Sequence, residues 1–161
     1  MAQLIAPRLR ATVPDDFEVK EQLTLLAPGG DMNVLFSSEP LDPAIDAERY
    51  TSIQGDVLER EFPGYQPMRV EPAPVFGGRP GYRRWFSWQP PPSEDGSPSV
   101  PVTQLQAYYA FNGRGYTATA TVPSFLLEHH QATMVAIMEK LDIASADTVE
   151  DAEAEHPADD P

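Results

Sequence analysis

The stretch TQLQAYYAFNGRGYTATATV, residues 103–122, decides the fold of this chain. Apolar and polar side chains alternate on both sides of the turn sequence NGRG at 112–115. Alternation with a period of two is typical of a β-strand with one buried face, and Asn-Gly tolerates the positive φ angles of a tight hairpin. The stretch therefore predicts two antiparallel strands of one sheet, at residues 102–111 and 115–122.

Further strands are predicted on the N-terminal side of this hairpin. A run at 66–71 and an aromatic-rich run at 82–89 precede it and complete an antiparallel meander. The proline-rich connection 89–101 is interpreted as a stiff, exposed hairpin loop, because both flanking strands need each other as partners. Short apolar runs bounded by glycine and proline predict three more strands, at 9–13, 21–28 and 32–38.

Two segments change to the three- and four-residue spacing of an amphipathic helix. The first spans 43–61, with Pro43 in its first turn and Asp42 as its N-cap. The second spans 124–141 and places Met134 and Met138 on one stripe. The order of elements predicts an α+β fold, an antiparallel sheet of about six to seven strands packed by two helices. We expect both helices to cover one face of the sheet.

Composition and charge limit the kind of protein. The 161 residues include no cysteine, which excludes disulfides and thiolate chemistry. The net charge is −14, but residues 142–161 hold 8 of the 25 acids and none of the 11 Lys and Arg residues, so the remainder carries only −6. We expect one domain at 1–143 and a disordered acidic tail at 144–161. With no signal-peptide pattern or apolar run of membrane-spanning length, we expect a cytoplasmic protein without stable membrane insertion.

Motifs for catalysis, metal binding and nucleic-acid binding are weak. The neighbouring His129 and His130 diverge by about 100° on a helix and cannot chelate one metal together. The glycines of GGRPGYRR, residues 77–84, do not have phosphate-loop spacing, and a strand follows them rather than a helix. Arg83 and Arg84 form a single basic pair within an acidic domain. We therefore expect a protein that is not an enzyme, has no cofactor or metal, and does not bind nucleic acid.

The strongest candidate site is the polar side of the predicted hairpin. Gln104, Gln106 and Tyr108 point to one side of their strand, because side chains two residues apart share a face. Solvent alone accounts for such a face on a one-sided sheet. A protein partner is the other interpretation, because uncharged amides and hydroxyls bond peptide groups without the desolvation cost of charges. The predicted partner-binding residues are Gln104, Gln106, Tyr108, Thr117, Thr119, Thr121 and Trp85.

Several short motifs occur together in a recognisable order. They are Pro14-Asp15, Asn33 within a strand, LEREFPGY at 58–65, FGGRPGYRRWFSW at 76–88, TQLQAYY at 103–109 and YTATATVP at 116–123. Over about residues 9–143 this pattern resembles the DcrB-like family of the PsbP-like (Mog/PsbP) fold. The resemblance implies an antiparallel sheet packed by two helices, in agreement with the periodicity.

One branch of that family, the Eag chaperones of type VI secretion, consists of cytoplasmic dimers that cradle transmembrane helices of effectors on a concave sheet face. Gln104, with Gln106 beside it, is similar to the glutamine strand of that branch. The resemblance implies a cytoplasmic chaperone or adaptor that binds an apolar helical segment of a secreted partner, and it leaves open a homodimer. The alternative expectation is a carrier of a small molecule or lipid in a pocket between sheet and helices.

Overall fold

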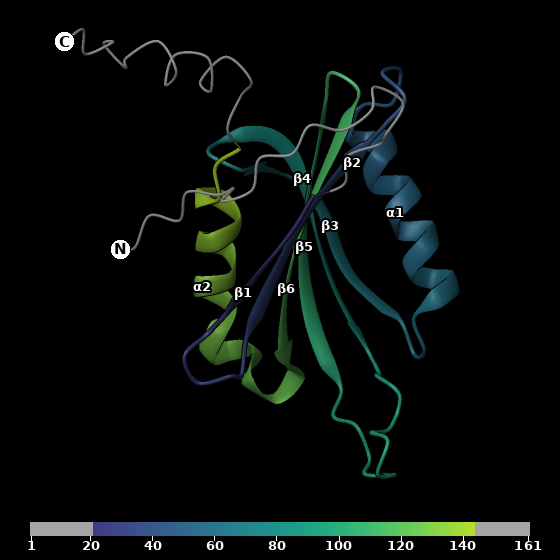
Figure 1. The fold of residues 1–161 in the computed structure, drawn as a ribbon, viewed down its shortest axis with the longest axis vertical. Coiled ribbons are helices and arrows are strands. Elements are labelled where there is room, and N and C mark those ends of the chain that lie inside the picture. The colour runs from purple at the N-terminus through teal and green to yellow at the C-terminus, as the bar shows by residue number, and fades with distance from the viewer. Residues whose placement is uncertain (1–20, 144–161) are drawn as a thin grey trace, which may run out of the picture.

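The computed structural model describes residues 21–143, and the strand expected at 9–13 and the acidic tail at 144–161 lie outside them. The described chain forms six strands, two α-helices and one short 3₁₀ helix (Figure 1). In chain order the elements are β1 Glu21–Leu26, β2 Asn33–Pro40, α1 Ala47–Glu61, β3 Gln66–Val75, β4 Arg79–Trp88, β5 Val102–Phe111, β6 Arg114–Pro123, η1 Ser124–Leu126 and α2 Leu127–Lys140.

The six strands form a single antiparallel sheet with the order β1-β2-β6-β5-β4-β3. The predicted α+β class and the hairpin of β5 and β6 are confirmed, with Gln106 opposite Thr119 in the register. Residues 89–101 connect β4 to β5 and project from one end of the sheet (Figure 1). β5 and β6 lie at the centre, so the stretch from which the fold was predicted is also the middle of the sheet.

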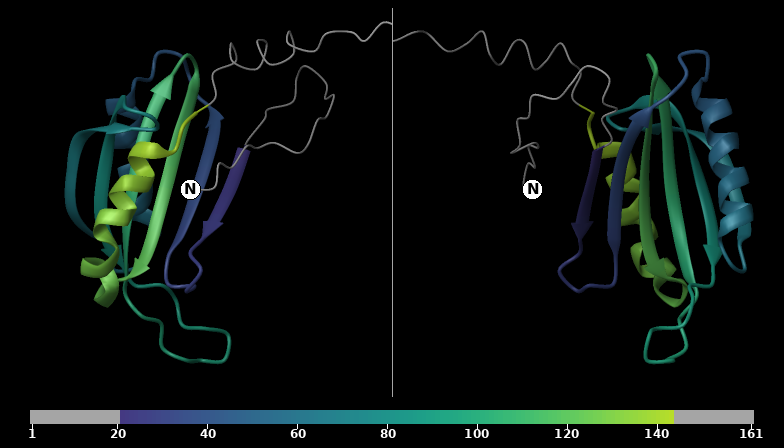
Figure 2. Two further views of the ribbon diagram at one scale, coloured as in Figure 1. Left: turned by 90° about the vertical axis from the view of Figure 1, so that its left-hand side faces the viewer. Right: turned by 45° about the vertical axis from the view of Figure 1, so that its right-hand side comes forward.

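The two helices lie on opposite faces of the sheet, as Figure 1 and the right-hand view of Figure 2 show. The expectation that both cover one face is wrong. Met134 and Met138 of α2 pack on the face that carries Leu105, whereas Tyr50 of α1 packs against Tyr108 on the other face. Both faces of β5 carry large side chains that need a cover, so each face receives one helix. We refer to these faces as the α1 face and the α2 face.

The first helix begins four residues later than predicted. Asp46, rather than Asp42, is the N-cap of α1, and its Oδ1 accepts a hydrogen bond of 2.8 Å from the backbone N–H of Arg49. The side chain of Asp42 instead accepts from the N–H of Ala44 at 2.9 Å. This local bond stabilises a turn that includes Pro43, and the helix starts only after that turn.

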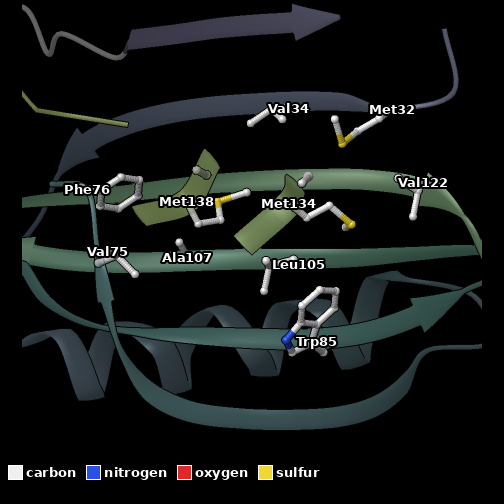
Figure 3. Close-up of a cluster of buried hydrophobic side chains, with 12 residues drawn as sticks. Met32, Val34, Val75, Phe76, Trp85, Leu105, Ala107, Val122, Met134 and Met138 are labelled. Atoms are coloured by element: carbon white, nitrogen blue, oxygen red, sulfur yellow. The ribbon is translucent and has the colours of Figure 1, made fainter. Parts of the chain in front are cut away.

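The main hydrophobic core lies between the sheet and α2 (Figure 3). Leu105, Ala107, Met134 and Phe76 are fully buried there. The core cluster consists of Met32, Val34, Val75, Phe76, Trp85, Leu105, Ala107, Ala118, Ala120, Val122, Met134 and Met138.

The turn between β3 and β4 caps the C-terminal end of α2. The N–H groups of Phe76 and Gly77 donate to the carbonyl oxygens of Met138 and Glu139, at 2.9 and 2.8 Å. Gly77 has a φ of +83°, a backbone conformation that favours glycine. The last turn of α2 is thus completed by a remote part of the sheet rather than by its own sequence.

Arg79, at the start of β4, stabilises the same contact between the β3–β4 turn and the end of α2. Its Nη1 donates to Asp142 Oδ1 at 2.7 Å, and its Nη2 donates to the carbonyl oxygen of Ile143 at 3.0 Å. These bonds hold the chain beyond α2 against the turn.

Candidate partner-binding face

The α1 face carries six of the seven predicted partner-binding residues. Gln104, Gln106 and Tyr108 lie opposite the three threonines of β6, as the register pairs of β5 and β6 show. Trp85 points to the other side, where it is 4% exposed in the core beneath α2. Successive residues of a strand alternate in direction, so its neighbours Arg84 and Phe86 belong to the α1 face and Trp85 does not.

Half of the α1 face is covered by the helix for which it is named, because α1 lies over β4 and β5. Tyr108 is completely buried, with its ring edge-on to Tyr50 at 6.2 Å between centroids. Gln104 and Gln106 are each 8% exposed. The glutamine strand is therefore not an open surface over most of its length.

A hydrogen-bonded network fills the space beneath α1. The hydroxyl of Tyr108 donates to Gln106 Oε1, and the hydroxyl of Tyr50 lies 3.1 Å from Glu39 Oε1 and 3.0 Å from Thr117 Oγ1. Burial raises the pKa of Tyr50 to about 12 and also raises the pKa of Tyr108. Both phenols therefore keep their protons at neutral pH and serve as hydrogen-bond donors.

Arg84 is a buried cation at the centre of this interface. Its Nη2 donates to the carbonyl oxygen of Thr51 at 2.8 Å, and its Nη1 donates to the hydroxyl of Tyr65 at 3.2 Å. No carboxylate of residues 21–143 forms an ion pair with it. Gly55 provides the necessary room, since a Cβ at that position would lie 2.3 Å from Nη1. A lone glycine within an amphipathic helix was the only sequence signal of this contact.

Within residues 21–143, no helix covers the other half of the α1 face, which lies over β1, β2 and β6 (Figure 2). We call this surface the open strip. The side chains of the strip are exposed or half-buried and uncharged, and Glu39, the next residue of β2 on the same face, lies just beyond its end. The strip consists of Thr24, Leu26, Asn33, Leu35, Ser37, Thr117, Thr119 and Thr121.

Gln104 lies at the border between the covered half and the open strip. Its Nε2 donates to Thr121 Oγ1 at 2.9 Å, whereas its Oε1 is buried and has no hydrogen-bond partner in the described part of the chain. Turning the amide over would exchange these two atoms and still leave one of them unsatisfied. This unsatisfied amide end lies beneath the surface of the strip rather than on it.

A polar pocket of about 360 Å³ opens between the N-terminal half of α1 and the end of the strip that carries Ser37 and Thr117. Glu39 is the one charged residue among its lining groups. Sequence reasoning missed this pocket because Glu39, Tyr50 and Thr117 come from three different elements, and Thr117 lies 67 residues from Tyr50. The pocket is lined by Gln22, Ser37, Ser38, Glu39, Tyr50, Gln54, Gln106, Thr117 and Thr119.

The described residues offer little for metal chemistry or membrane crossing. No group of three or more His, Cys, Asp or Glu side chains that could hold a metal ion occurs within 21–143. His130 instead forms a 2.8 Å contact from its Nε2 to Asp31 Oδ2, which joins α2 to the β1–β2 turn and lowers the pKa of that carboxyl. Neither helix of this part of the chain has the length and apolar run that a bilayer crossing demands.

Comparison with known proteins identifies structural relatives only. No protein-family model matches the sequence, and no curated protein matches it. The crystal structure of PA94 from Pseudomonas aeruginosa, a protein of unknown function, matches with a TM-score of 0.58 and 18% identity, over 83% of this chain and 90% of that chain. LpqN of Mycobacterium tuberculosis, which is involved in cell envelope biogenesis, matches with a TM-score of 0.43 and 17% identity, over 81% and 78%. The likeness to PA94 establishes a shared fold.

Proposed function

We propose that this protein is a non-enzymatic chaperone or adaptor that holds an apolar helical segment of a partner protein against the open strip. The observation that carries the proposal is the absence of charged side chains from this strip, in a chain with 25 acidic residues. A sheet face that is exposed only to solvent tolerates Lys and Glu. A face that is desolvated on binding favours uncharged groups, because removing water from them costs little free energy.

The dimensions of the strip suit a single helix. Three strands spaced about 4.8 Å apart give roughly 10 Å between the outer two, which is close to the roughly 10–12 Å diameter of a helix. On β2 the strip runs from Asn33 to Ser37, which at about 3.4 Å per residue is roughly 14 Å, and with Glu39 the same face extends for roughly 20 Å, the length of about 14 helical residues. Leu26 and Leu35 supply apolar contacts on this surface.

The resemblance to the Eag chaperones of the DcrB-like family supports the same proposal. We propose that the protein is a member of that family which acts in the cytoplasm on a secreted effector and can form a homodimer. The alternative, a small-molecule or lipid carrier, gains less support, because the pocket beside α1 is lined mainly by hydroxyl and amide groups.

A peptide-binding experiment tests the proposal. The probe is a fluorescent 18-residue helical peptide of alanine, leucine and serine, and its affinity for the full chain is measured by anisotropy. We expect Leu35→Lys, and independently the exposed Thr24→Lys, to weaken binding at least about tenfold, because each places an ammonium group in the desolvated contact. The matched control Gln131→Lys adds the same charge on the outer side of α2 and should bind like the wild type.

Two results would count against the proposal. Equal affinity of the wild type and both strip variants would show that the peptide binds elsewhere. No binding by the wild type, together with a small molecule retained in native mass spectrometry, would favour the carrier.

A further inference from the structure

The pocket beside α1 has the chemistry of a site for an ammonium group. Glu39 is half-buried, and among residues 21–143 its one hydrogen-bond partner is the hydroxyl of Tyr50, which donates to Oε1. The remaining lining groups are amides and hydroxyls, which offer further acceptor oxygens. A lysine ammonium has three donors and no acceptor, so one carboxylate and two neutral oxygens satisfy it completely.

Other ligand classes fit this pocket less well. An anion would meet the carboxylate of Glu39 and the oxygens around it, with no cationic side chain among the lining residues. A neutral sugar commonly stacks on an open aromatic face, but the ring of Tyr50 is buried, with its edge contacts made to Tyr108 and the backbone region of Gly115. The acidic field of the whole molecule, with a net charge of −14, also favours a cation.

The position of the pocket indicates that the cation belongs to a polypeptide. Ser37, Thr117 and Thr119 are part of both the open strip and the pocket lining, so the two surfaces are continuous. A helix that lies on the strip would bring a side chain from its end directly to Glu39. The long methylene stem of lysine allows its ammonium group to reach a polar site while its backbone remains on an apolar surface.

We propose that the pocket receives a lysine side chain at one end of the apolar partner segment, with Glu39 as its counter-ion. The inference rests on the proposed function, because the partner segment must first occupy the open strip. It also fixes the direction of the bound segment. The basic end of the segment lies at the Glu39 end of β2, and the purely apolar remainder extends toward Asn33.

The experiment compares two probe peptides on the full chain. Both are the 18-residue Ala/Leu/Ser helix, and they differ only at the last position, which is lysine in one and norleucine in the other. We expect the lysine peptide to bind the wild type about tenfold more tightly, since a half-buried ion pair contributes on that order. In Glu39→Gln the preference should disappear while the affinity for the norleucine peptide stays unchanged.

Two further variants distinguish loss of the lysine site from loss of the folded structure. Gln54→Lys places an ammonium group in the pocket from α1 and should also remove the preference. Glu48→Gln, an exposed acid on the same helix, is the matched control and should retain it. Far-UV circular dichroism confirms that each variant is folded.

The outcomes separate this inference from the proposed function. If neither peptide binds the wild type, both fail. If both peptides bind equally, or if Glu39→Gln keeps the tenfold preference, the lysine site is refuted and the strip remains. If butylamine alone, at millimolar concentration, binds the pocket with the same Glu39 dependence but lysine gives no advantage in the peptide, the site serves a free amine and the inference is overturned.

Discussion

Replacing Gly55 by alanine should destabilise the protein, although the same change stabilises an ordinary helix. Alanine is favoured over glycine within a helix by about 1 kcal/mol. Here, however, the new Cβ would lie 2.3 Å from Nη1 and 2.5 Å from Nη2 of Arg84, so the guanidinium must move. It would lose its hydrogen bonds to Thr51 and Tyr65, each worth about 1.5–3 kcal/mol for a charged donor. After subtraction of the helix gain, the free energy of unfolding should fall by about 2–5 kcal/mol.

Urea denaturation followed by circular dichroism measures this change, and a double-mutant cycle identifies its cause. In the Arg84→Met background the guanidinium is absent, so Gly55→Ala should then be neutral or stabilising by up to about 1 kcal/mol. Ser52→Ala, at an exposed position of the same helix, is the control and should shift stability by no more than about 0.5 kcal/mol. A Gly55→Ala protein that is more stable than the wild type would refute the proposed role of Gly55.

Three further predictions concern the core and the two junctions of α2. Leu105→Ala, at a fully buried position, should lower the free energy of unfolding by about 2–5 kcal/mol in urea, and an effect below about 1 kcal/mol would contradict the packing described. Arg79→Ala should cost about 1 kcal/mol and accelerate hydrogen exchange at the N–H groups of Phe76 and Gly77, whereas the exposed Arg69→Ala should change neither. Because the bond from His130 lowers the pKa of Asp31, that carboxyl stabilises the fold fully above its ordinary value of 3.8 and loses this effect as pH falls through the lowered value. Asp31→Asn should therefore be less stable than the wild type at pH 6, with a smaller difference at pH 3, and a constant difference would exclude the linkage.

Much of the fold could be predicted from local periodicity. The alternation around Leu105 and Ala107 located the central strands, and the spacing of Met134 and Met138 located α2, because one buried face imposes a period of 2 on a strand and 3.6 on a helix. The start of α1 was misplaced because Asp42 and Asp46 are equally good caps in sequence, and only the three-dimensional turn selects between them.

The candidate site was less accessible to sequence reasoning. A glutamine that faces solvent and one that is buried with a partner look alike in a pattern, and the bond between Gln106 and Tyr108 is invisible there. Tyr108 has a large apolar ring that packs against α1, although Gln104 and Gln106 on the same face of β5 are polar. This packing is why α1 covers half of the face. The pocket depends on Tyr50 and Thr117, which are 67 residues apart, and no local signal encodes such a contact.

The arrangement of α2 has a consequence for synthesis of the chain. α2 is the last described element to leave the ribosome, yet it supplies the cover of the main core and its final turn is completed by the β3–β4 turn. Until residues 127–140 emerge, the apolar side of β5 and β6 has no helix to cover it. The apolar face of the sheet is therefore buried only after α2 has been synthesised, and a ribosome stalled before α2 holds a sheet whose exposed face is prone to aggregation.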